Sequence, residues 1–232
     1  MIRNCSLEEI SDGRLYGLND LVKADTAGCS GCTTKCCYGM GDTIVLDPYD
    51  VYRLEKHLGQ TFEQLLADKI AINKVDDVLL PNLKMDEKTG GCAFLNNEEE
   101  RCTIHGARPA MCRLFPLGRY WADEETFHYI LQTGQCKKSN LSKIKVKKWI
   151  DCDNIKEYDE YVVLWHKYIK RISAAINECM RTSDSQLAAT QVKTICMYTL
   201  KTFYMTGYNF DKDFFVQFKE RLYEAYHMLG IN

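Results

Sequence analysis

The chain has 232 residues, of which 46% are hydrophobic and 27% are charged, so it can bury a core and is not a disordered chain. Its formal net charge of −2 gives no overall attraction to nucleic acid or to an anionic membrane. No apolar run reaches the roughly 18 residues of a membrane-spanning helix, and the first residues carry acids where a signal peptide needs an apolar stretch. We therefore expect a cytoplasmic protein with neither a nucleic-acid nor a membrane partner.

The first third of the chain predicts helices. The helical spacing of apolar residues within 15–22 predicts a short helix that leads toward a cysteine-rich stretch. Residues 43–46 predict a brief buried strand or an extended lead-in. A helix is then expected from Asp47 and Pro48 to Gly59, because the aspartate can accept hydrogen bonds from free amides and proline at the first helical position loses none.

A second helix is expected to be capped by Thr61 and to carry apolar residues as far as Ile70. Residues 75–120 alternate short apolar pieces with turn residues, which predicts irregular β-like structure and then a short helical turn near Pro109. Residues 117–131 predict a hairpin, with strands at 117–121 and 127–131.

The basic run at 143–148 indicates a solvated loop or an edge strand rather than a nucleic-acid patch. From about Asn154 the apolar residues repeat at three and four. This spacing predicts one helix after Asn154, a second over roughly 185–204, and a third capped by Asp211 and ending at Gly230.

These elements together predict an α+β fold, mainly α. An irregular cysteine-rich metal-binding core with short strands is expected to precede a C-terminal bundle of about three helices. Residues 1–150 would form the cysteine-cluster region and residues 151–232 a helical region packed on it, or both would form a single domain.

Twelve cysteines are present, and eight of them fall into two groups. In a reducing cytosol such a density indicates metal binding or catalysis rather than disulfides. Cys29 and Cys32 are spaced so that both sulfurs can reach one metal. The side chains of the adjacent Cys36 and Cys37 diverge, so the two serve different metals or one ligates while the other packs. The predicted metal ligands are Cys29, Cys32, Cys36, Cys37, Cys92, Cys102, Cys112 and Cys136.

A four-thiolate site carries excess negative charge, and Arg108 and Arg113 flank Cys112 closely enough to offset it. His105 is either a substitute for one sulfur or a surface histidine. The remaining cysteines are interpreted as small buried hydrophobic residues: Cys5, Cys152, Cys179 and Cys196.

The motifs occur in a specific order: Cys-x2-Cys-x3-Cys-Cys, then Cys-x-Phe-Leu, Cys-x-Ile-His and Arg-Pro-x-x-Cys-Arg-x-Phe-Pro. This order resembles the bacterial and archaeal cysteine-cluster family of the YkgJ type, which is named for zinc or iron chelation and includes flagellin lysine N-methylase. The resemblance covers roughly residues 25–140. It implies metal binding through the same eight cysteines.

Three functions remain open. The first is a metal-binding protein whose cluster has a structural or redox role, with an iron–sulfur cluster favoured over zinc because eight thiols exceed the needs of one structural zinc. The second, suggested by the family, is an enzyme that methylates protein lysine with S-adenosylmethionine. Against it, the usual Gly-rich loop is missing, since 39–41 holds only two glycines and follows no clear strand. The third is an adaptor whose C-terminal helices bind a protein partner. No catalytic residue is identified.

Overall fold

The computed structural model describes residues 6–26, 36–96, 98–99, 101–136, 138, 140–182 and 184–231. The chain is 47% helical and 20% strand, which confirms the predicted α+β class. None of the described helices combines the length and the apolar composition that a membrane span requires.

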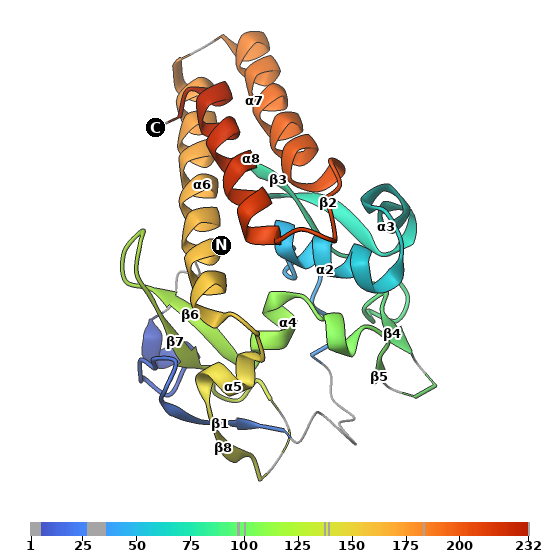
Figure 1. Cartoon of the computed structure of the whole chain (residues 1–232), viewed down its shortest axis with the longest axis vertical. Coiled ribbons are helices and arrows are strands. Elements are labelled where there is room, and N and C mark those ends of the chain that lie inside the picture. Colours follow the sequence, from blue (N-terminus) through green and yellow to red (C-terminus); the bar gives the residue numbers. More distant parts are fainter. Residues whose placement is uncertain are drawn as a thin grey trace.

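The strands form antiparallel pairs, β1 with β8, β2 with β3, β4 with β5 and β6 with β7. Helix α6 packs against both α7 and α8, and strand β3 contacts α6 and α7. Figure 1 shows these three helices in the upper half of the molecule, with the β1–β8 and β6–β7 pairs below them. The elements are, in chain order, α1 (Leu7–Ile10), β1 (Leu21–Asp25), α2 (Pro48–Leu58), α3 (Phe62–Asp68), β2 (Ile70–Val75), β3 (Val78–Leu83), β4 (Leu95–Asn96), β5 (Arg101–Cys102), the 3-10 turn η1 (His105–Ala107), α4 (Ala110–Leu114), β6 (Leu117–Trp121), β7 (Phe127–Leu131), β8 (Ser142–Lys145), α5 (Val146–Ile150), α6 (Ile155–Thr182), α7 (Ser185–Leu200), the π-helical turn η2 (Lys201–Met205) and α8 (Phe214–Leu229).

Helix α2 begins and ends where the sequence predicts. The Asp47 carboxylate accepts a hydrogen bond from the Asp50 amide at 2.8 Å, and the Asp50 carboxylate accepts one from the Asp47 amide at 3.3 Å. Pro48 takes the first helical position, and Gly59 ends the helix in the left-handed conformation with φ of 64°. The second oxygen of Asp50 accepts from the Ala110 amide at 2.7 Å, which ties α2 to the first residue of α4.

One hydrophobic core contains residues from both predicted regions. The Tyr49 amide donates to the Tyr161 hydroxyl at 3.0 Å, and the Tyr204 hydroxyl donates to the Leu46 carbonyl at the same distance. The ring of Tyr49 also packs against Phe214, with centroids 4.9 Å apart. The start of α2 is therefore fixed by side chains from α6, η2 and α8, while the boundary at residue 150 stays a prediction.

Several local predictions are confirmed. The β6–β7 hairpin has the expected register, with Leu117 opposite Leu131 and Trp121 opposite Phe127. Residues 43–46 are an extended lead-in that hydrogen-bonds β3, and the basic run begins in the edge strand β8.

Two helix predictions are wrong because strand pairing prevails over local spacing. Residues 21–25 form β1, in which Val22 is buried opposite Ile144 of β8. Helix α3 ends at Asp68, and Ile70 instead begins β2, which pairs with β3. Val22 pairs with a strand far along the chain and Ile70 with the strand that follows its own, and in both cases this pairing overrides the local helical spacing.

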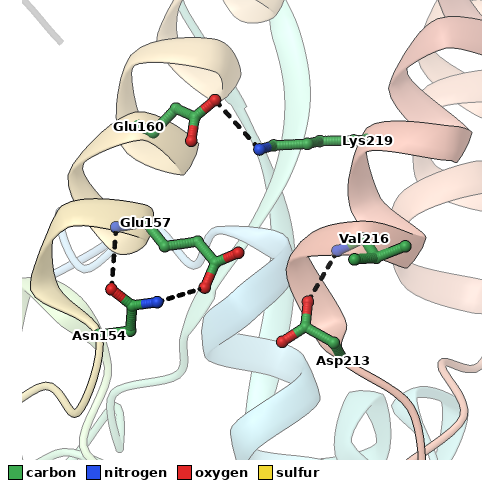
Figure 2. Close-up of polar contacts among 6 residues, drawn as sticks. All are labelled: Asn154, Glu157, Glu160, Asp213, Val216 and Lys219. Carbon is green, nitrogen blue, oxygen red and sulfur yellow. Dashed lines mark hydrogen bonds and ion pairs between the residues drawn. The ribbon is translucent and has the colours of Figure 1, made fainter.

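The cap of α8 also differs from the prediction, which named Asp211. Figure 2 shows that Asp213 accepts the hydrogen bond from the Val216 amide, at 2.8 Å. The same view contains the Glu160–Lys219 ion pair at 3.0 Å between α6 and α8, whose side chains are 57% and 42% exposed. An ion pair this exposed stabilises the packing of the helices by about 1 kcal/mol or less.

We expect Asp50→Ala to lower the free energy of unfolding by about 2–4 kcal/mol, because it removes one half of the capping box of α2 and leaves the Ala110 amide buried without a partner. Asp213→Ala is the matched control, since Asp213 is exposed and caps its own helix, and it should cost about 1 kcal/mol. Urea unfolding of both variants measures the difference. Equal losses in the two variants would show that the link from α2 to α4 contributes nothing.

Candidate metal centre

Five of the predicted ligands line one cavity of about 480 Å³. They come from four separate points of the chain: the adjacent pair Cys36 and Cys37, then Cys92, Cys102 and Cys112. We call this part of the cavity the thiol end. Each position is fixed by backbone pairing or by a helix cap rather than by contact between the sulfurs alone.

The first pair of cysteines is held beside Cys92 by backbone hydrogen bonds. The Cys92 amide donates to the Cys37 carbonyl at 2.8 Å, and the Gly39 amide donates to the Gly90 carbonyl at the same distance. Both glycines have positive φ angles, 66° and 68°, which residues other than glycine rarely adopt. The glycines at 39–41 therefore form a turn that pairs with the Cys92 segment.

Cys102 and Cys112 reach the cavity from two further elements. Cys102 ends the two-residue strand β5 and lies opposite Leu95 in β4. Cys112 lies in α4, a helix too short to be stable by its own hydrogen bonds. It is held at its first residue by Asp50 and at its last by the Trp149 indole, whose Nε1 donates to the Leu114 carbonyl at 3.0 Å.

The thiols are close enough to influence one another's pKa. The hydrogen bond between Cys36 and Cys37 lowers the pKa of Cys36 and raises that of Cys37. Burial raises the pKa of Cys92, Cys102 and Cys112, and the other thiols raise that of Cys112 further. Buried thiols of this kind keep their protons unless a positive charge replaces them.

Of the two predicted flanking cations, Arg108 lies at the thiol end. Its charge lowers the pKa of Cys36 and Cys102, although burial is the larger effect on Cys102. Arg113 does not line the cavity; it is 6% exposed and lies over the Tyr158 ring at 5.3 Å. Neighbouring residues of a helix point about 100° apart, so Arg113 faces away from the side that Cys112 presents.

His105 also lines the thiol end. Its Nε2 atom is buried and has no hydrogen-bond partner. Burial, with Arg108 as the next cause, lowers the pKa of His105 and favours the neutral ring that can bind a metal. The alternative role that the sequence left open for His105, as a substitute for a sulfur, is therefore compatible with its position.

The other predicted ligands do not share this placement. Cys29 and Cys32 lie outside the described residues. Cys136 is half-buried and does not line the cavity. Within the described part of the chain, no group of three or more His, Cys, Asp or Glu side chains has the arrangement of a metal site. Three cysteines that were interpreted as non-ligands lie within the described residues, and none of them lines the cavity: Cys152, Cys179 and Cys196.

The cavity continues beyond the thiols into a part that sequence analysis missed. Six residues from three elements line it, and we call this part the inner chamber. Their apolar members show the spacing of ordinary core residues, and no local motif joins α6 to the two strands. The lining residues that define the inner chamber are Leu80 of β3, Leu117 and Arg119 of β6, and Val162, Trp165 and Ile169 of α6.

Comparison with known proteins identifies a family for the cysteine-rich part. No solved structure was found to match the chain. The family model CxxCxxCC, described as a "putative zinc- or iron-chelating domain", matches residues 28–137. This span begins one residue before Cys29 and ends one residue after Cys136, so it contains all eight predicted ligands. Residues 28–137 therefore match the cysteine-cluster family that the order of the motifs indicates.

Proposed function

We propose that the protein binds iron or zinc through cysteine sulfurs, and that iron in an iron–sulfur cluster is the first choice of the two. The observation that carries the proposal is the shared cavity of Cys36, Cys37, Cys92, Cys102 and Cys112. These thiols are brought together from distant points of the chain in a domain whose family is named for chelating these metals.

The residues at the thiol end fit such a metal. Thiolates are soft ligands that suit iron–sulfur clusters and zinc, and Arg108 supplies a positive charge that offsets theirs. Cys29, Cys32 and Cys136 complete the proposed set of eight on the basis of the family resemblance. When bound, iron–sulfur would supply one-electron transfer and zinc a rigid cross-link.

A structural role of the metal follows from the weak local structure around it. Strands β4 and β5 have two residues each, and α4 has five. Elements this short are not stable alone, so a metal that joins their thiols would add its binding free energy to the free energy of folding.

No contact among the described residues favours the methyltransferase alternative, and S-adenosylmethionine is not proposed as a cofactor. The adaptor function likewise stays a prediction, because none of the described contacts selects a protein partner.

Anaerobic purification tests the metal directly. We expect a brown protein that contains iron and acid-labile sulfide, with visible absorption that is lost on reduction or on exposure to oxygen. A colourless protein with stoichiometric zinc would show that the cysteine site binds zinc rather than iron. Absence of both metals from a freshly isolated, oxygen-protected sample would contradict the proposal.

Cys112→Ser should lower the affinity for metal by more than about 10-fold, because losing even a group that only supports a ligand costs about 10- to 100-fold. Elemental analysis and thermal unfolding, measured on the same samples, report the loss. Cys179→Ser is the matched control, since Cys179 lies in α6 and does not line the cavity. Metal content that falls equally in both variants, or in neither, would show that the ligands were assigned wrongly.

A further inference from the structure

The cavity is larger than a metal site requires. Its volume of about 480 Å³ lies within the range of roughly 300–1,000 Å³ that pockets for small organic ligands occupy. The thiols and Arg108 account for one end only. The inner chamber is walled by aliphatic side chains and by Trp165, so its surface suits the carbon skeleton of a ligand.

Arg119 is the cation of the inner chamber, and it has unused hydrogen-bonding capacity. Its Nη2 donates to the Tyr158 hydroxyl at 2.9 Å, and its guanidinium lies over the rings of Phe127 and Tyr158 at 5.6 Å. Its Nε is buried without a hydrogen-bond partner. Among the ion pairs of the described residues, none includes Arg119.

Asp47 and Asp159 lie near enough to Arg119 to interact with its charge, but neither forms an ion pair with it among the described residues. The Asp159 carboxylate accepts a hydrogen bond from the Tyr129 hydroxyl at 2.7 Å. Asp47 and Asp50 also line the cavity, but their oxygens accept hydrogen bonds from the amides of Asp50, Asp47 and Ala110. Burial raises the pKa of both the Asp47 and the Asp50 carboxyl groups, while the charge of Arg119 lowers that of Asp47. Arg119 is half-buried, and a guanidinium withdrawn from water without an ion pair is costly, so the arrangement favours an anion brought by a ligand.

The aromatic residues beside the chamber carry no competing positive charge. Trp121 stacks on His166 with ring centroids 3.7 Å apart, and both rings line the cavity. Burial is the main cause that lowers the pKa of His166 to about 4, so its ring is neutral near pH 7. Arg119 is therefore the group in this part of the cavity that can select for charge.

We infer that the inner chamber binds a small organic monocarboxylate, with Arg119 holding the carboxylate and the apolar walls enclosing its carbon skeleton. A guanidinium presents paired donors that match a carboxylate. A phosphate ester, which carries more charge, would need further cations beside Arg119. The other arginines that line the cavity lie with the thiols: Arg101 precedes Cys102, and the charge of Arg108 acts on Cys36 and Cys102. The inference does not depend on the metal, because no proposed ligand of the metal lines the chamber.

The test is calorimetric titration of the full-length protein with isovalerate, 3-phenylpropionate and indole-3-acetate, each compared with its neutral amide. We expect at least one acid to saturate with a dissociation constant on the order of a millimolar or lower, as its size allows. Its amide should bind at least about 10-fold more weakly, because the charge-assisted hydrogen bond to Arg119 is lost. Lack of saturation by all three acids, or equal binding of acids and amides, would overturn the inference.

Two variants locate the site. Arg119→Gln should reduce acid binding to the level of the amide, while Arg171→Gln, which changes an arginine of α6 that lies over Tyr226 outside the cavity, should leave it unchanged. Val162→Phe should weaken acid and amide alike by filling the chamber. It also keeps the test decisive if circular dichroism shows that Arg119→Gln is unfolded. A folded Arg119→Gln protein with unchanged acid affinity would contradict the inference.

Two further measurements separate the alternatives. Benzylphosphonate that binds more tightly than 3-phenylpropionate would overturn the choice of a carboxylate. Metal content is measured on every variant and should equal that of the unmodified protein in Arg119→Gln. A metal-free protein that still binds the acids would contradict the proposed function alone, and a metal-loaded protein that binds none would contradict this inference alone.

Discussion

The buried carboxylate of Asp50 joins the two segments between which the thiol end is built. One oxygen closes the cap of α2 and the other receives the amide of Ala110, the first residue of α4. Asp50 is 1% exposed, so neither bond competes directly with water. Since α4 has five residues and Cys112 is the third, the direction of that thiol depends on Asp50 at one end and Trp149 at the other. The metal proposal therefore requires an intact link between α2 and α4.

The family match ends at residue 137, but the cavity does not. Val162, Trp165 and Ile169 of α6 form one wall of the inner chamber, and the Tyr158 and Tyr161 hydroxyls bind Arg119 and the Tyr49 amide. Helix α6 thus supports the same elements that carry the cysteines. The matched residues alone therefore lack the α6 side chains that line the cavity and the Tyr158 hydroxyl that binds Arg119.

The structural features that can be predicted from the sequence are those determined by residues close together in the chain. Asp47, Pro48 and Gly59 determine the ends of α2 through hydrogen bonds and backbone conformations within the helix itself. The sequence does not predict β1, because Val22 is buried only by pairing with Ile144 far along the chain. Ile70 was predicted to extend α3 but belongs to β2, because it pairs with Leu83 of the neighbouring strand β3.

The same distinction between local and long-range features applies to the candidate site. The cysteines could be identified as candidate ligands without a structure, because their residue type and spacing in the sequence already indicate metal binding. Arg119 could not, because it lies in a strand among ordinary residues, and its place in the cavity wall and the absence of an ion pair among the described residues appear only once β6 lies against α6. Arg113 is the opposite case. It follows Cys112 in the chain and was therefore expected beside the thiols, but the helical turn of α4 directs the two side chains differently, and Arg113 does not line the cavity.

The thiol end and the inner chamber are connected through α4 and β6, which follow each other in the chain. Cys112 lies in α4, and Leu117 and Arg119 lie in β6 only a few residues later. Both elements are anchored to parts of the molecule that do not line the thiol end: α4 to Trp149 of α5, and Arg119 to Tyr158 of α6. Only Phe115 and Pro116 join α4 to β6, so the positions of Cys112 and Arg119 both depend on these two anchors, and loss of either anchor would disturb both parts of the cavity.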